Sequence, residues 1–366
     1  VGLCAIAGRI AAGSAVDDEV HNLPGVDFAI NYRQYYGYLE ATDGRFLHYW
    51  FFESQRNATD DPLVLWFNGC TSLVGALTEQ GPLLVKPDGT GLYANEGAWN
   101  REANLLFIEG PAGVGFSYKK DGNYTTDDDE SVANTYAALQ VFYRRFPAVA
   151  DSDLYVAGES YASLTVPLLS SVIAGHIRAN RTDIKLRAFA LGNGWWDWDA
   201  PYDAQIPYAY YHGLIDSALW AELLANCCAP GGGADRCDFK GEASRNAKCK
   251  APVKRATDLI NTPRLNTYNI YADCHNVTDP SHPVCFDERP LESWINQPDV
   301  RRALHIPDQV HRWHAFQTFK VTDPTYVTMR PQYRDLLRWT APDGRPFKVL
   351  HYAGDVDIMA PFLGIQ

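Results

Sequence analysis

The chain has 366 residues, of which 46% are hydrophobic, so it can bury one large core or two smaller ones. Its formal net charge of −12 argues against nucleic acid as a partner, because phosphate binding needs a basic face. No apolar run approaches the ~20 residues of a membrane-spanning helix, so we expect no membrane span.

Residues 1–15 are small and apolar and end in Gly13-Ser14-Ala15, which is typical of the tail of a secretory signal peptide. A disordered N-terminal arm is the alternative. Four N-x-S/T sequons indicate N-glycosylation in the same pathway, at Asn57, Asn123, Asn180 and Asn276. We therefore expect a protein of the secretory pathway, and these residues leave open whether its destination is lysosomal or extracellular.

Short aromatic or apolar runs predict the first strands. Tyr35–Glu40 and Phe46–Phe52 flank Asp43-Gly44, as in a β-hairpin. Leu63–Phe67 and Leu105–Ile108 are unbroken apolar runs, as expected of strands that are buried on both faces.

Two polar or glycine-rich stretches suggest ligand sites that we set aside. The loop Glu109–Tyr118 lacks the Lys-Ser/Thr of a P-loop, and Pro111 removes a backbone donor, so nucleotide binding is not expected. The acidic run Asp127–Glu130 stands where a helix begins, and it favours the helix dipole rather than a metal site. We expect neither a cofactor nor a metal ion.

The stretch Leu154–Ala162 is an apolar run that ends at Gly158 and places Ser160 two residues later. Apolar residues then recur at helical spacing, which predicts a strand, a sharp turn and a helix. A serine on such a turn stands clear of the sheet beside the helix N-terminus, as in a nucleophile elbow. The motif is G-x-S-x-A rather than G-x-S-x-G, and a buried helix-capping serine is the alternative.

Leu186–Leu191 and Phe347–Ala353 predict two more strands, followed by Gly192-Asn193-Gly194 and Gly354–Asp357. Strands that alternate with helices indicate an α/β sheet with parallel pairs, whose chemistry lies at the carboxyl ends of the strands. The alternation covers residues 22–200 and 291–366.

Residues 201–290 break this alternation and hold six of the eight cysteines. Their crowding favours disulfides made in an oxidising compartment, while a zinc site is disfavoured because no paired C-x-x-C occurs. We expect a helical, disulfide-bonded insertion that forms a cap over the active site. The residues alone leave the pairing open among Cys227, Cys228, Cys237, Cys249, Cys274 and Cys285.

Five motifs occur in order near the ends of the predicted strands: Leu65–Gly69, Thr78–Pro82, Gly113–Tyr118, Gly158–Ala162 and Tyr352–Asp357. From about Asn22 to the last residue, the chain resembles the serine carboxypeptidases of the α/β-hydrolase fold, and most of all their lysosomal members. The resemblance implies a hydrolase that removes C-terminal residues from peptides through an acyl-enzyme.

The resemblance also implies roles for single residues. Ser160 would be the nucleophile, and Asp357, the second acid of the Gly-Asp-x-Asp turn, would be the triad acid, while Asp355 would be structural. The backbone N–H of Tyr161 would supply half of the oxyanion hole, and Gly69 lies near the other half. The implied disulfides are Cys227 with Cys249, Cys228 with Cys237, and Cys274 with Cys285.

Asn68 and Glu159, with Glu79 beside Glu159, match the residues that bind the free C-terminal carboxylate of a peptide substrate. A carboxyl group donates a hydrogen bond to a carboxylate only while it is protonated. Since a neighbouring carboxyl and burial both raise a carboxyl pKa, such a pair would work best at acidic pH. Taken alone, Glu79 is better explained as an ordinary surface glutamate.

The chain departs from the family pattern in three places. Only Gly69 separates Asn68 from Cys70, where the family has Gly-Gly-Pro-Gly, so the second oxyanion donor is in question. Ser163 and Thr165 replace a Gly and a Tyr. No His follows Asp357, although the His follows the acid in this fold; His351 precedes it. We interpret the sequence as a fragment, with an inactive relative as the alternative.

Two classes of function remain. The first is a serine carboxypeptidase, favoured by the residues that match the site. The second is a non-catalytic protective or binding relative, favoured by the missing His and the short loop. An acyltransferase is a third, weaker option. The sequence leaves the oligomeric state open, a homodimer included.

Overall fold

The computed structural model describes residues 15–69, 71–197, 200–229, 237–274, 285, 287–316 and 326–365. Its centre is an eight-stranded sheet made of β1 Gln34–Glu40, β2 Arg45–Phe52, β3 Leu63–Phe67, β6 Asn104–Ile108, β7 Tyr118–Lys119, β8 Asp153–Glu159, β9 Lys185–Gly192 and β10 Lys348–Tyr352. The strand order is β1-β2-β6-β3-β8-β9-β10, and β7 pairs with β2.

The pairing confirms the hairpin and the parallel sheet that the sequence predicts. Strands β1 and β2 are antiparallel, and β2 is also antiparallel to β6. From β6 through β3, β8 and β9 to β10 every pair is parallel. The carboxyl ends of these five strands therefore meet at one edge of the sheet, where ligands bind in open α/β sheets.

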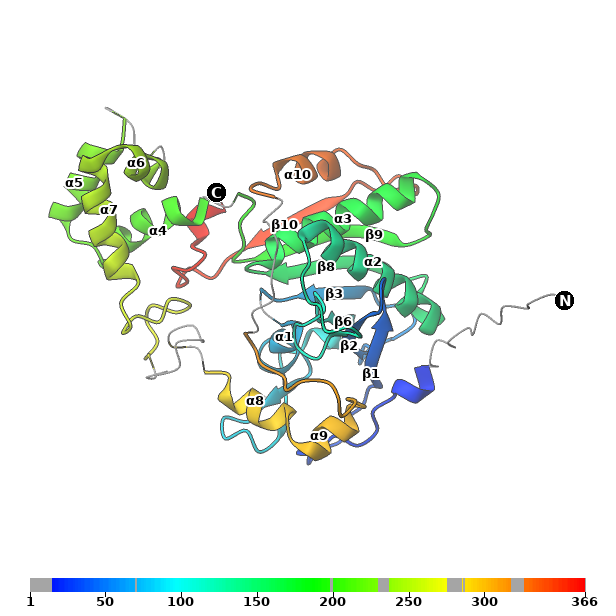
Figure 1. Cartoon of the computed structure of the whole chain (residues 1–366). Coiled ribbons are helices and arrows are strands. Elements are labelled where there is room, and N and C mark those ends of the chain that lie inside the picture. The colour runs from blue at the N-terminus through cyan, green and yellow to red at the C-terminus, as the bar shows by residue number, and fades with distance from the viewer. Residues whose placement is uncertain are drawn as a thin grey trace.

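Helices cover both faces of the sheet (Figure 1). One face carries α2 Asp128–Arg145, α3 Ala162–Arg178 and α10 Arg330–Leu337, and the other carries α1 Ser72–Thr78, α8 Arg289–Ile295 and α9 Pro298–Ala303. Strand β2 shows the consequence, because Tyr49 and Phe51 enter one core while Trp50 and Phe52 enter the other. Asp127 caps α2 by accepting the Glu130 N–H (2.8 Å), so the acidic run begins a helix as expected.

Several short elements were not predicted from the sequence. They include α1, α8 to α10 and a small antiparallel pair, β4 Leu83–Val85 and β5 Leu92–Ala94. Within the described ranges, 3-10 helices occur at Ala15–Asp18, Trp99–Arg101, Pro147–Val149 and Phe362–Gly364. None of the helices in the described part of the chain is long and apolar enough to span a membrane.

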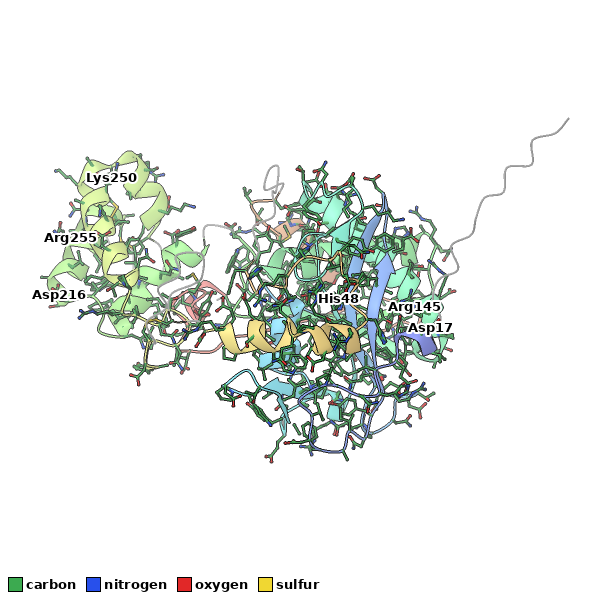
Figure 2. All side chains as sticks on the ribbon, turned by 60° about the horizontal axis from the view of Figure 1, so that its bottom comes forward. Asp17, His48, Arg145, Asp216, Lys250 and Arg255 are labelled. Atoms are coloured by element: carbon green, nitrogen blue, oxygen red, sulfur yellow. A yellow bond between two sulfur atoms is a disulfide. The ribbon has the colours of Figure 1, made fainter. Side chains whose placement is uncertain are left out.

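The insertion forms a helical unit beside the sheet, where Asp216, Lys250 and Arg255 lie (Figures 1 and 2). Its helices are α4 Ala200–Tyr211, α5 Ser217–Cys227, α6 Phe239–Arg245 and α7 Ala247–Ile260, and they enclose a separate apolar core. Disulfides join Cys227 to Cys249 and Cys228 to Cys237, the pairings that the resemblance implies. Cys274 is bonded to Cys285 after this unit.

A largely buried ion pair attaches the first described residues to the sheet. Asp18 Oδ2 accepts hydrogen bonds from the Arg145 guanidinium (2.5 Å) and the Tyr49 hydroxyl (2.7 Å). Arg145, labelled in Figure 2 with Asp17, is only 7% exposed and also donates to the Tyr38 carbonyl (3.0 Å). Removing the carboxylate would leave a buried guanidinium without its counter-charge.

We expect Asp18→Ala to lower the free energy of unfolding by about 3 kcal/mol, because breaking a buried ion pair leaves one charge uncompensated. Urea unfolding measures the change. Asp151→Ala is the control, because Asp151 pairs with Lys185 at the surface and such pairs add little to stability. Equal stability of Asp18→Ala and Asp151→Ala would contradict the structural role of Asp18.

Candidate active site

Ser160 lies at a sharp turn between β8 and α3. Its φ is +56°, in the left-handed region that non-glycine residues seldom adopt. The Ser160 N–H donates to the Gly192 carbonyl (3.2 Å), and the Ser160 carbonyl accepts from the N–H (3.0 Å) and the hydroxyl (2.7 Å) of Ser163. Strand, strained turn and helix together have the geometry of a nucleophile elbow.

Close packing around this turn explains its small residues. A Cβ on Gly158 would lie 2.6 Å from the Phe67 carbonyl oxygen and 2.7 Å from the Ala162 Cβ. The strand and the helix therefore approach each other too closely for a side chain at position 158. Ala162, which stands where G-x-S-x-G has its second glycine, is fully buried and fits beside that glycine.

The residues at the end of β3 lie against Ser160. A Cβ on Gly69 would lie 2.8 Å from the Ser160 Oγ and 2.9 Å from the Tyr161 backbone nitrogen. The three residues assigned to nucleophile and oxyanion hole are thus neighbours in space. Cys70, the next residue of the short loop, lies outside the described residues.

Asn68 holds two carboxyl groups together. Its Nδ2 donates to both oxygens of Glu79 (3.2 and 3.1 Å) and to Glu159 Oε1 (3.0 Å). Its Oδ1 accepts from the Trp66 indole N–H (2.8 Å) and the Gly75 N–H (2.9 Å), which fixes the orientation of the amide. Glu79 is therefore not an ordinary surface glutamate.

The environment of this pair favours the protonated form. Burial raises the pKa of Glu79, and the charge of Glu159 raises it further. Burial also raises the pKa of Glu159, although the hydrogen bond from Asn68 opposes this. A pair that retains a proton can donate a hydrogen bond to a carboxylate as well as accept one.

Asp357 is buried in the turn after β10, whereas Asp355 is exposed. Its Oδ1 accepts from the backbone N–H groups of Met359 (2.6 Å) and Ala360 (3.1 Å). Burial raises the pKa of Asp357 to about 6, against the effect of these hydrogen bonds. Burial and orientation are what a serine-hydrolase triad requires of its acid.

An open cleft of about 520 Å³ contains these groups, since Gly69, Glu79, Glu159, Ser160 and Asp357 all line it. This volume lies within the range of small-molecule sites. Apolar side chains supply much of the remaining wall: Val74, Trp195, Tyr268, Phe316, Val356 and Met359. The sequence analysis assigned none of these residues to the site, and they come from distant segments. Trp195 had a signal in its place just after a strand, and Val356 in its place within the Tyr352–Asp357 motif.

His351, the histidine nearest in sequence to the acid, is not in this cleft. Its Nε2 is 2.8 Å from the Tyr333 hydroxyl, and it lines a different hollow together with Trp196. Among the residues described here, no histidine lines the cleft with Ser160.

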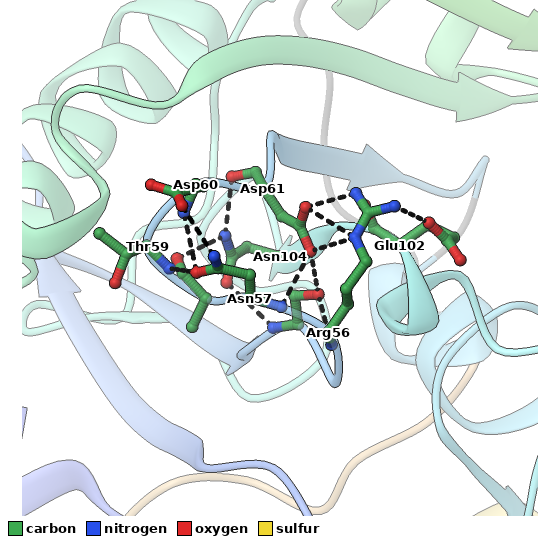
Figure 3. Close-up of polar contacts among 9 residues, drawn as sticks. Arg56, Asn57, Thr59, Asp60, Asp61, Glu102 and Asn104 are labelled. Atoms are coloured by element: carbon green, nitrogen blue, oxygen red, sulfur yellow. Dashed lines mark hydrogen bonds and ion pairs between the residues drawn. The ribbon is translucent and has the colours of Figure 1, made fainter.

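Three of the four sequon asparagines are described and exposed: Asn57, Asn123 and Asn180. Asn276 lies outside the described residues. Figure 3 shows Asn57 in a polar turn, where its Oδ1 accepts from the N–H groups of Thr59 (3.1 Å) and Asp60 (3.2 Å). Asp61 in this turn pairs with Arg56, which also bonds to Glu102.

Both the sequence and the fold match known proteins. A model of the family described as serine carboxypeptidase matches residues 24–366. The chain belongs to the serine carboxypeptidase family. The lysosomal protective protein of Mus musculus is 35% identical, over 95% of this chain and 79% of its own length. Serine carboxypeptidase ctsa-4.1 of Caenorhabditis elegans is 34% identical, over 93% and 76%.

A solved structure supports the fold. Kex1(Δ)p, a prohormone-processing carboxypeptidase from Saccharomyces cerevisiae, matches with a TM-score of 0.77 over 96% of this chain and 81% of its own, at 24% identity. The mixed sheet with its helices is thus of the α/β-hydrolase type, as the sequence resemblance implies.

The carboxyl pair predicts a pH dependence of stability. The pKa of Glu79 is raised above its ordinary value of 4.5, so above that pH the folded protein binds more protons than the unfolded chain. The free energy of unfolding must therefore fall as the pH rises above 4.5. Glu79→Gln removes the titrating group, and its stability should fall less.

Urea unfolding at about pH 5 and about pH 7 measures this difference. Glu96→Gln, a change at an exposed glutamate, is the control and should keep the wild-type dependence. If Glu79→Gln lost as much stability as the wild type between the two pH values, Glu79 would not carry the shifted proton.

Proposed function

We propose that this family member is a serine-type carboxypeptidase that releases C-terminal residues from peptides through an acyl-enzyme, most effectively in acid. The observation that carries the proposal is the presence in one cleft of Ser160, Asp357 and the Glu79–Glu159 pair. A nucleophile beside a carboxylate-binding pair selects the last peptide bond, because the free terminus anchors the substrate.

In the proposed reaction, Ser160 Oγ attacks the last peptide carbonyl, and the N–H groups of Tyr161 and Gly69 stabilise the developing oxyanion. The triad base would take the proton of the Ser160 hydroxyl and give it to the peptide nitrogen. The C–N bond then breaks, the last residue leaves as a free amino acid, and water hydrolyses the acyl-enzyme. Asp357 would orient the histidine base of a Ser-His-Asp triad. The protonated Glu79–Glu159 pair and Asn68 would bind the substrate carboxylate.

We also propose that the protein travels the secretory pathway, to the lysosome or the outside of the cell. The disulfides fit an oxidising compartment, and one relative is named as a lysosomal protein. N-glycans would occupy the exposed Asn57, Asn123 and Asn180, and also Asn276. Residues 201–290 would act as a cap on a core of residues 22–200 and 291–366, and Tyr268 would be its contribution to the cleft wall.

A non-catalytic protective or binding role is the second candidate. It is favoured by the histidine-free lining of the cleft in the described part of the chain. Binding of a peptide terminus depends on Asn68 and the carboxyl pair, not on a base. Such a protein would hold peptides without cleaving them.

Carboxypeptidase activity predicts that a peptide loses single C-terminal residues, while the same peptide with a C-terminal amide is spared, because an amide carries no charge for the carboxyl pair to bind. Mass spectrometry of the two reactions over time measures the difference. Ser160→Ala is the control for the nucleophile. If the protein cleaves neither peptide but still binds peptide, the result would contradict carboxypeptidase activity and support the protective or binding role.

The carboxyl pair predicts which limb of the pH profile changes in Glu159→Gln. In the wild type, activity should fall as the pH rises, because the pair loses the proton that it donates to the substrate carboxylate. Gln donates an N–H at every pH, so the variant should keep a low KM into neutral solution. Peptide hydrolysis measured across pH tests this; an unchanged profile would exclude the pair as the carboxylate site.

A further inference from the structure

The turn that follows β9 contacts both the nucleophile and the acid. On the nucleophile side, the Gly192 carbonyl accepts the Ser160 N–H (3.2 Å). Gly194 lies against Ser163, where a Cβ would come within 2.9 Å of the Ser163 Cβ. Ser163 in turn holds the Ser160 carbonyl, so the two glycines of this turn buttress the elbow.

Asn193, between these glycines, bonds to the turn that carries Asp357. Its Nδ2 donates to the carbonyls of Gly354 (3.2 Å) and Ala360 (3.2 Å), and its Oδ1 accepts the Gly354 N–H (2.9 Å). Its backbone N–H donates to the Tyr352 carbonyl (3.1 Å). One side chain thus joins the start and the end of the acid turn.

The Asn193 backbone is itself in a rare conformation. Its φ is +36°, in the left-handed region, where asparagine is one of the better tolerated residues. Strained residues of this kind persist where their surroundings determine them, and they cluster at functional sites. Asn193 also lines the cleft with Ser160 and Asp357.

We propose that Asn193 is a positioning residue, which holds the turn of residues 354–360, and hence Asp357, at a fixed place relative to Ser160. The link runs through Ala360, since its carbonyl is bound by Asn193 and its N–H binds Asp357 Oδ1. The effect on catalysis rests on the proposed function, whereas the effect on the turn does not.

The chemistry of the contacts specifies an amide. Two carbonyls require donors and one N–H requires an acceptor, and of the side chains that match Asn193 in length only asparagine offers both. Asn193→Asp keeps the shape and the acceptor but turns a carboxylate oxygen toward two carbonyls. Asn193→Gly keeps the backbone conformation and removes the side chain, so the two variants separate φ from hydrogen bonding.

The aspartate variant should also disturb the acid itself. Burial raises the pKa of Asp357, and the hydrogen bonds from the N–H groups of Ala360 and Met359, with a smaller effect of the Asn193 amide, oppose the rise. The other ionisable groups that act on Asp357 or its turn are Glu159 from β8, Tyr208 from α4 and Asp355. A carboxylate at position 193 would add a further negative charge beside Asp357.

Amide hydrogen exchange tests the positioning without relying on activity. In both variants the amides of residues 353–360 should exchange about tenfold faster or more, because the two hydrogen bonds from the side-chain amide to the carbonyls of Gly354 and Ala360, which hold the turn, are lost. Amides of β8 and α2 should keep their wild-type protection, which excludes general unfolding. Asn180→Gly is the matched control, since Asn180 has a φ of +53° and lies outside the cleft. Unchanged exchange at 353–360 in Asn193→Gly would overturn the proposal.

Peptide release tests the consequence for catalysis. Asn193→Gly should lower kcat by about 10-fold to 100-fold, as expected for a displaced catalytic group, and should change KM by less than about threefold. Asn193→Asp should move the acid limb of the kcat profile to higher pH than in Asn193→Gly. Wild-type kcat in Asn193→Gly would contradict the catalytic part. A wild type that releases no residue would refute the proposed function alone, since exchange still reports on the turn.

Discussion

The close approach of backbone segments around Ser160 is the constraint on which the site depends. Gly158 brings β8 against the end of β3 and the start of α3, and Gly69 brings the end of β3 against the Ser160 side chain. Since a Cβ fits at neither position, Ser160, the Tyr161 N–H and Asn68 are placed by the main chain. Parallel pairing of β3 with β8 then sets the register, with Phe67 opposite Gly158.

That backbone frame brings three carboxyl groups to one cleft, of which Asp357 is buried and Glu79 and Glu159 are partly buried. Glu79, Glu159 and Asp357 line one cleft, and no lysine or arginine lines it with them among the described residues. Burial of unpaired charges is costly, and a group in that position shifts its pKa and becomes neutral. Raised carboxyl pKa values reduce stability near neutral pH, and in the function proposed above they supply the proton that a substrate carboxylate would accept in acid. The neutral amide of Asn68 satisfies both glutamates without supplying a counter-charge.

The sequence predicted best what is local. Ser160 could be found because a strand, a glycine and a helical period adjoin it, and the paired strands followed from unbroken apolar runs such as Leu63–Phe67. Glu79 could not be found in this way, since it follows a helix that was not predicted, and its environment depends on Glu159 far along the chain. From the sequence, Asn193 could be recognised only as a residue that follows a predicted strand. Its three side-chain bonds to residues 354–360 are a property of the folded sheet edge.

The helical insertion is connected to the site at the same edge of the sheet, through the turn that carries Asp357. The acid turn is held on one side by β9, through Asn193, and on the other by the helical segment, where the Tyr208 hydroxyl donates to the Asp355 carbonyl (2.7 Å) and the Ile358 N–H to the Thr267 carbonyl (3.0 Å). Ile358 is part of the apolar core of the helical unit. Ile358, the residue after Asp357, is therefore anchored in the apolar core of the helical unit, whereas Asp357 itself lines the cleft at the edge of the sheet. A displacement of the helical unit would act on Asp357 before it acted on Ser160, because Ser160 is held by β8, β9, α3 and the end of β3.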